Sequence, residues 1–226
     1  MKIFKLNTDT TFNENNICLA IGNFDGFHKG HQKIISILKK VSKEKNLQSA
    51  IMSFDPHPRK FFDNSIKSFN IYTKEDKLNF LNNFQLDIYI DFSFDKKLSE
   101  YSSTNFVKKI LVNKLKINNL VVGSDFKFGK NRSGNIELLN QLSIEHSYKV
   151  NLVDTIKIKN SSEKYSSSLI RKDIQNGNME SVHQSLGRYW HITGKIIQGQ
   201  RKAREINFPT ANIELSDHIL PKKGVY

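Results

Sequence analysis

The sequence predicts an α/β protein built on a doubly wound parallel sheet. Short apolar runs alternate with longer stretches of helical periodicity, and glycine-rich or polar turns follow several of these runs. Strand–helix–strand alternation implies a parallel sheet with helices on both faces. Ligands of such sheets bind beyond the carboxyl ends of the strands.

Five strands and four helices are expected along the main part of the chain. The strands are 17–21, 50–54, 87–92, 120–123 and 150–153, and the helices are 31–45, 73–84, 104–116 and 135–146. In the first helix Ile34, Ile35 and Leu38 recur at helical spacing, with lysines on the opposite face. Thr73, with an aspartate three residues later, predicts a capped helix start.

The pattern changes after about residue 185. The stretch WHITGKIIQGQ alternates like a strand, and NFPTANIEL followed by PKKGVY indicates irregular chain and further strand. About forty residues are too few for an independent all-β core. We therefore expect a main domain over residues 1–184 and an incomplete all-β domain over residues 185–226.

Composition narrows the class of protein. The chain has 38% hydrophobic and 25% charged residues, as soluble globular proteins do. No apolar run approaches the ~20 residues of a membrane-spanning helix, and the N-terminus lacks the apolar core of a secretory signal. Cys18 is the single cysteine, which excludes an intramolecular disulfide. We expect a cytoplasmic protein without a membrane partner.

The net charge of +13 comes from lysines spread along the whole chain, as on solvated helix faces. A nucleic-acid partner is therefore not expected, although a module that used this charge would bind with steep salt dependence. A positive field equally suits ligands that carry phosphate.

The segment GNFDGFHKGH at residues 22–31 directly follows the first expected strand. Gly22 lets the chain turn, and Gly26 and Gly30 are expected to allow close approach of a ligand. Asn23 and Asp25 are short polar residues suited to a tight turn. We expect Asp25 to order this turn rather than to act as a base.

The two histidines of this segment are expected to act together. His28 and His31 are three residues apart, so in the first turn of a helix they share a face. That face lies beside free N–H groups and the positive end of the helix dipole, which predicts a donor-rich phosphate pocket. Such a pocket suits attack on the α-phosphate of a nucleotide. A metal site is not expected, because no third ligand has suitable spacing.

These residues carry a family resemblance. GNFDGFHKGH resembles the G-x-F-D-x-x-H-x-G-H signature of the nucleotidyltransferase superfamily, in the form of the prokaryotic bifunctional riboflavin kinase/FAD synthetases. SSSLIR at 166–171 is similar to a second superfamily element, and SFDPHPRKFF at 53–62 and VVGSDFKFGKNRSG at 121–134 resemble this family specifically. GRYWHITGKIIQG and FPTANIEL resemble the start of its riboflavin kinase module.

The resemblance implies a Rossmann-like nucleotidyltransferase domain followed by the start of a riboflavin kinase barrel. It implies an FAD synthetase that transfers AMP from ATP to FMN, with Mg²⁺ carried mostly by the nucleotide. The implied catalytic residues are His28, His31 and Arg171. The implied ATP and phosphate contacts are Gly22, Asn23, Phe24, Asp25, Gly30, Ser167 and Ser168.

The flavin contacts implied by the resemblance are Phe62, Asp125, Phe126 and Phe128. From the residues alone, Phe62 could offer apolar surface to an isoalloxazine ring or belong to the core. GSDFKFG could equally be a polar turn with both phenylalanines buried. The histidines outside the first motif are expected to be structural or on the surface: His57, His146, His183, His191 and His218.

PTAN at 209–212 resembles the kinase motif in which Thr210 and Asn212 help to hold ATP-bound magnesium. Ala203 and Asn207 stand where the family has glycine. Because the chain stops before the rest of the barrel, we expect no riboflavin kinase activity from these 226 residues, and riboflavin as a ligand only of a complete module.

Two other functions stay open on the sequence. One is a related adenylyl- or cytidylyltransferase with another phosphate-bearing acceptor, such as phosphopantetheine or nicotinamide mononucleotide. The other is a non-catalytic binder of nucleotide or flavin, which would bind ATP and FMN without releasing pyrophosphate.

Overall fold

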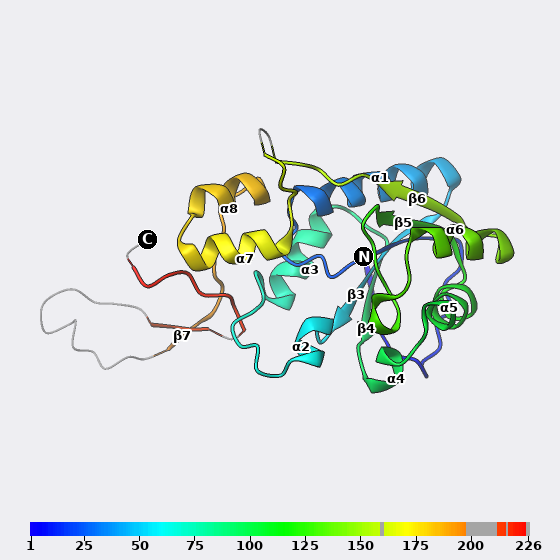
Figure 1. The fold of residues 1–226 in the computed structure, drawn as a ribbon, viewed down its shortest axis with the longest axis horizontal. Coiled ribbons are helices and arrows are strands. Elements are labelled where there is room, and N and C mark those ends of the chain that lie inside the picture. Colours follow the sequence, from blue (N-terminus) through cyan, green and yellow to red (C-terminus); the bar gives the residue numbers. More distant parts are fainter. Residues whose placement is uncertain (159–160, 198–211, 216, 225–226) are drawn as a thin grey trace, which may run out of the picture.

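A computed structural model describes residues 1–158, 161–197, 212–215 and 217–224. A six-stranded sheet with the order β1-β4-β3-β2-β5-β6 forms its centre, and every strand pair in this sheet is parallel. Figure 1 shows the helices packed around this sheet, with α7 and α8 together at one end of the molecule. The doubly wound parallel sheet predicted from the sequence is confirmed.

The strands are β1 (Lys2–Leu6), β2 (Ile17–Ile21), β3 (Gln48–Asp55), β4 (Ile88–Ser93), β5 (Ile117–Gly123), β6 (Lys149–Val153), β7 (Lys195–Ile197) and β8 (Asn212–Glu214). The α-helices are α1 (Lys29–Lys45), α2 (Pro58–Phe62), α3 (Lys74–Asn83), α4 (Lys96–Ser99), α5 (Ser103–Asn105), α6 (Ile136–Glu145), α7 (Ser167–Asn176) and α8 (Met179–Leu186). A π-helix, η1 (Phe106–Lys114), continues α5, and η2 (Lys130–Arg132) is a short 3₁₀ turn.

The sheet is buried on both faces, because alternate residues of its central strands enter two different cores. In β2, Ile17, Leu19 and Ile21 pack toward η1 and α6, whereas Cys18 and Ala20 pack toward α1 and α3. All of β2 is buried, which is why the strand is a continuous apolar run rather than an alternating one.

The strand β1 was not predicted. It pairs with β4 at the edge of the sheet, and only its last residue, Leu6, is buried. A strand that contributes so little to a core carries no strong hydrophobic pattern. The helix expected over residues 104–116 is present as α5 followed by the π-helix η1.

The C-terminal part packs against α7 and α8. Ile219 is buried in a cluster with Ile71, Ile170, Ile174 and others from the region around these helices. The short strands β7 and β8 form a separate antiparallel pair, in keeping with the start of a barrel. The predicted boundary after residue 184 falls within α8 and stays a prediction. In the described part of the chain no helix has the length and apolarity needed to cross a membrane.

Candidate active site

The candidate site lies where the strand order of the sheet reverses. From β2 the chain builds through β3 and β4 on one side and through β5 and β6 on the other. A cleft of about 400 Å³ opens at this point, bounded by the turn after β2, the turn after β5 and the start of α7. Such switch points are where doubly wound sheets bind ligands.

Two buried aromatic residues shape the turn after β2. Phe24 and Phe27 have φ values of 50° and 45°, and their rings stack with 6.2 Å between centroids. The Phe24 side chain therefore anchors the turn in the core. Only its backbone could make the contact with ATP that the resemblance implies. Gly26 has a φ of 84°, and a Cβ there would stand 2.9 Å from Cδ1 of Ile71. This glycine permits close packing inside the protein, not the approach of a ligand as expected.

His28 and His31 stand together at the N-terminus of α1. His28 is the N-cap, and its Nδ1 accepts a hydrogen bond of 3.3 Å from the backbone N–H of His31. The two imidazole rings stack with centroids 3.7 Å apart, so their spacing does bring them to one face. Because Nδ1 of His28 accepts, the proton of the neutral ring lies on Nε2, which can donate to a ligand.

Both imidazoles are neutral near pH 7. Burial lowers the pKa of His28 to about 4, with a further lowering by Arg171 and an opposing effect of Asp125. Burial is the main cause that holds the pKa of His31 well below its usual value, and the neighbouring His28, Lys77 and Arg171 lower it further. A bound phosphate would raise both pKa values, because a nearby negative charge favours the imidazolium form.

The cleft contains buried polar atoms that lack partners among the described residues. Oδ1 of Asn23 and Nδ1 of His31 are two of these, and both residues line the cleft. Buried polar groups are normally paired, so both atoms mark places where a ligand would complete a hydrogen bond. Gly22 and Gly30 line the same region, and a Cβ on Gly30 would meet the His28 ring at 3.0 Å. Gly30 therefore leaves room for the imidazole of His28.

Arg171 and Asp25 form a buried ion pair beside the cleft. Nη2 of Arg171 donates to Asp25 at 2.5 Å, and its Nε donates to the Phe69 carbonyl at 2.9 Å. The guanidinium carbon lies 3.8 Å from the centroid of the Phe69 ring. Asp25 also accepts the backbone N–H of Ile71 at 3.1 and 3.2 Å. Asp25 thus orders its turn, fixes Arg171 and binds the loop before α3 (residues 69–71).

Three consecutive serines begin α7. Ser166 is the N-cap and accepts the N–H of Leu169 at 3.2 Å. Ser167 donates to the Asp25 carbonyl at 2.7 Å and so ties α7 to the turn after β2. Ser168 is exposed and lines the cleft. The unpaired N–H groups and positive dipole end of this first turn favour an anion in the cleft.

A second cavity of about 530 Å³ adjoins the cleft and is largely aromatic. Its aromatic lining consists of Phe54, Phe62, Phe94, Phe106, Phe126 and Phe128, with His57 at the side shared with the cleft. Phe62 is 70% exposed at the rim, and the rings of Phe126 and Phe128 stack at 5.5 Å. The fourth residue expected to contact flavin, Asp125, lines the cleft instead and pairs with Lys164.

His57 and Arg59 connect the two spaces. His57 was expected only as a structural or surface residue, and Arg59 was not expected in the site. Each lines the cleft and the aromatic cavity, as Arg132 also does. His57 caps α2 by accepting the N–H of Arg59 at 3.1 Å, and burial, Arg171 and Lys77 lower its pKa to about 3. The sequence feature that could have indicated His57 is its place in a proline-flanked turn, DPHP, directly after a buried strand.

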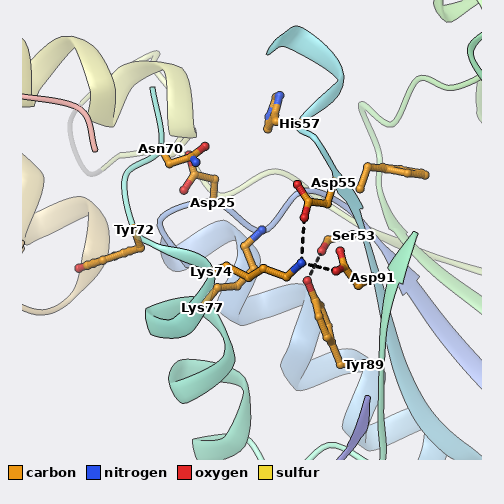
Figure 2. Close-up of a pocket in the computed structure, with 11 residues that line it drawn as sticks. Asp25, Ser53, Asp55, His57, Asn70, Tyr72, Lys74, Lys77, Tyr89 and Asp91 are labelled. Carbon is orange, nitrogen blue, oxygen red and sulfur yellow. Dashed lines mark hydrogen bonds and ion pairs between the residues drawn. The ribbon is translucent and has the colours of Figure 1, made fainter. Parts of the chain in front are cut away.

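A small polar pocket of about 70 Å³ lies beside the carboxyl ends of β3 and β4 (Figure 2). Lys74 donates to Asp55 at 2.8 Å and also to Asp91, and the two dashed lines at its ammonium mark these bonds. Lys77 donates to the Asn23 carbonyl at 3.0 Å. Lys77 therefore supports the turn after β2, whereas Lys74 joins the carboxylates at the ends of β3 and β4.

Of the two residues expected of the kinase module, only Asn212 is among the described residues, and it does not line the cleft. Thr210 lies outside the described residues, and Asn212 is exposed at the start of β8. Among the described residues, no group of three or more His, Cys, Asp or Glu side chains is arranged to hold a metal ion.

Comparison with known proteins identifies the family. Residues 10–169 match the FAD synthetase family and residues 186–226 match the riboflavin kinase family. A bifunctional riboflavin kinase/FMN adenylyltransferase from Buchnera aphidicola subsp. Schizaphis graminum is 36% identical over 211 residues, which cover 93% of this chain and 67% of that protein. The protein of the same name from Listeria monocytogenes is 37% identical over 213 residues, again 93% and 67% of the two chains.

A solved structure shares the fold. It is described as a macrolide-efflux protein from Streptococcus pneumoniae and aligns with a TM-score of 0.80 over 99% of this chain and 73% of that chain. At 22% identity this likeness concerns the fold alone. The family match, by contrast, spans the turn after β2, the lining of both cavities except Arg171, and the first residues of α7, and the chain therefore belongs to the FAD synthetase family.

Proposed function

We propose that this chain transfers the adenylyl group of ATP to FMN, which yields FAD and pyrophosphate, across the two adjoining cavities. The observation that carries the proposal is their juxtaposition: a donor-rich cleft at two helix N-termini shares His57 and Arg59 with an aromatic cavity. Phosphate groups suit the first space, and an isoalloxazine ring suits the second. The relatives from Buchnera and Listeria carry the same activity in their names.

The reaction is an in-line displacement at phosphorus. An oxygen of the FMN phosphate attacks the α-phosphorus of ATP, the bond from that phosphorus to the bridging oxygen breaks, and pyrophosphate leaves. An FMN phosphate is largely ionised at neutral pH, so the attack needs no protein base. Asp25 therefore does not act as a base and keeps its ion pair with Arg171. His28 and His31 would donate N–H groups to the transferring phosphate, where negative charge accumulates.

The other phosphates of ATP would lie toward α7. Ser168 and the free N–H groups of the first turn line that side of the cleft, with Arg171 beside them. Arg171 has five N–H donors, more than its bonds to Asp25 and Phe69 use, and is held rigidly for bidentate contact. Gly22, Asn23 and Gly30 would border the phosphates on the side of β2.

We assign Mg²⁺ to the nucleotide. Mg²⁺ takes oxygen ligands and is commonly held by substrate phosphates and one or two protein oxygens. Oδ1 of Asn23, buried in the cleft lining without a partner among the described residues, is an oxygen of this kind. When bound, the cation neutralises charge on the phosphates.

The proposal includes the division of the chain. Residues 1–184 would form the adenylyltransferase domain, and residues 185–226 would belong to a riboflavin kinase module whose ligand is riboflavin, since residues 186–226 match that family. The buried, unpaired Cys18 is in keeping with a cytoplasmic enzyme.

The experiment is pyrophosphate release from ATP and Mg²⁺ with and without FMN, with the flavin product identified by chromatography. We expect FMN-dependent pyrophosphate with an equal amount of FAD. Release that depends on another phosphate-bearing acceptor instead would identify a related transferase. Binding of ATP and FMN without any release would indicate a non-catalytic binder.

A further inference from the structure

A short segment near the end of the chain, residues 217–219, pairs with the loop before α3. The Asp217 carbonyl accepts the N–H groups of Phe69 and Asn70 at 3.1 and 2.9 Å. The N–H of Ile219 in turn donates to the Asn70 carbonyl at 2.8 Å, and Ile219 is only 2% exposed. The pairing is therefore anchored by Ile219 in the buried cluster around α7 and α8.

The side chain of Asp217 extends this contact to α2. Its Oδ2 accepts the side-chain amide of Asn70 at 3.0 Å and also binds Nζ of Lys60. Lys60 directly follows Arg59, which lines both cavities, and precedes Phe62 at the rim of the aromatic cavity by two residues. One carboxylate thus connects the flavin side of the site to the loop before α3.

The same loop holds the catalytic arginine from its other side. Phe69 supplies the carbonyl and the ring that contact Arg171, and the N–H of Ile71 binds Asp25. A second residue of the C-terminal part, Trp190, donates from Nε1 to the Ile71 carbonyl at 3.0 Å. The loop before α3 is therefore fixed between the Arg171–Asp25 pair and a stretch of chain that matches the riboflavin kinase family.

We propose that Asp217 is a positioning residue for adenylyl transfer, supplied from the segment that matches the kinase family. This rests on the proposed function. Asp217 lines neither cavity nor the small polar pocket, so it acts through others. Its carboxylate binds Lys60 and so sets α2 against the aromatic cavity. The same carboxylate binds the Asn70 side chain and, together with the main-chain bonds of the Asp217 carbonyl to Phe69 and Asn70, sets the loop that supports Arg171.

The two arms of this contact can be separated by substitution. Asp217→Ala removes both side-chain contacts, and we expect a higher KM for FMN, a lower kcat and a loss in kcat/KM of about 10-fold, since small misplacements reduce turnover strongly. Asp217→Asn keeps an acceptor for Asn70 but loses the charge that holds Lys60, so only the KM for FMN should rise. Lys60→Met should give the same result as Asp217→Asn.

The control is Glu214→Gln, which removes an exposed acidic group from β8, in the same stretch that matches the riboflavin kinase family. It should leave both kinetic constants unchanged. In the Asp217→Ala background, Lys60→Met should add nothing to the KM for FMN, because the contact is already lost. If the wild-type chain forms FAD and Asp217→Ala has wild-type kcat and KM, Asp217 is not a positioning residue, although the adenylyltransferase assignment stands.

A second measurement does not depend on turnover. Amide hydrogen exchange over α2 and the loop before α3 should be faster in Asp217→Ala than in the wild type, and unchanged in Glu214→Gln. Should the wild-type chain form no FAD, the proposed function fails, and this comparison alone then decides whether Asp217 orders the two segments. Equal exchange in Asp217→Ala and wild type would overturn the inference.

Discussion

At the scale of the residue, the two ring nitrogens of His28 have different roles. Nδ1 caps α1 by accepting the His31 N–H, and this bond places the proton of the neutral imidazole on Nε2. The low pKa, caused first by burial, keeps the ring neutral in the free protein. Near neutral pH the ring is thus a fixed hydrogen-bond donor, and a bound phosphate would favour its charged form.

Replacing this donor should reduce the chemical step. We expect His28→Ala to lower kcat by about 10²–10³-fold, as for other donors to a transition-state oxygen, and to destabilise α1 by about 1 kcal/mol through loss of the cap. His28→Ser restores a capping oxygen without the imidazole, so it should recover stability but not turnover. Steady-state FAD formation and urea unfolding measure both effects, and wild-type kcat in either variant would remove His28 from the mechanism.

The buried histidines should also make the protein sensitive to acid. The pKa of His28 falls from 6.5 to about 4 in the folded state, so the unfolded chain binds more protons between these values. Stability should therefore be complete above about pH 6.5 and decline as the pH falls toward about 4, by on the order of 3 kcal/mol for His28. His57, with a pKa of about 3, acts in the same direction.

Urea unfolding across this pH range tests the acid sensitivity. His28→Asn keeps a capping oxygen and has no titrating ring, so its profile should be flatter than that of the wild type. Parallel profiles for the two proteins would show that His28 does not titrate differently on folding.

At the scale of the element, the turn from β2 into α1 depends on two glycines for different reasons. Gly26 has a left-handed conformation and abuts Ile71, whereas Gly30 lies in the first turn of α1 against the His28 ring. The first glycine serves the fold, and the second serves the position of a functional side chain.

Alanine at these two positions should separate stability from activity. Gly26→Ala should destabilise the protein by about 1–3 kcal/mol, because a Cβ is strained at positive φ and meets Ile71. Gly30→Ala favours the helix by about 0.5–1 kcal/mol but displaces His28, so we expect unchanged or higher Tm with about 10-fold lower FAD formation. Equal activity in Gly30→Ala and wild type would show that His28 tolerates the displacement.

At the scale of the whole molecule, the charge of +13 is partly gathered around the cleft. Its lining holds five basic residues, Arg59, Lys127, Arg132, Lys164 and Arg171, against two acidic ones, Asp125 and Asp154. A positive field over a cleft raises the local concentration of anionic substrates. Basic residues outnumber acidic ones in the lining, so the cleft suits the polyphosphate of ATP, while most lysines lie elsewhere on the chain.

The affinity for ATP should accordingly depend on salt. We expect the KM for ATP to rise several-fold between about 0.05 and 0.5 M NaCl, as screening shortens the reach of these charges. Arg132→Gln, in the cleft lining, should reduce this dependence, whereas Lys33→Gln, an exposed α1 residue outside the lining, should not. A KM that does not change with salt would exclude long-range steering.

Local patterns in the sequence predicted much of this molecule. Five of the six strands of the main sheet, the glycine turn and the histidine pair follow from short apolar runs, helical spacing and turn residues, which act over a few neighbouring positions. The edge strand β1 was missed because most of its residues are exposed and carry no apolar pattern.

The tertiary structure decided the rest, because the deciding contacts join distant residues. The position of Arg171 is set by its ion pair with Asp25 and its contacts with Phe69, and each of these residues is more than a hundred positions away in the sequence. His57 lies between the two cavities because β3, which precedes it, pairs with β2 in the sheet. The sequence by itself thus determined the fold class and the glycine-rich turn after β2 with its histidine pair. Which side chains share one site, and that Asp217 supports it, depends on long-range packing that no local pattern encodes.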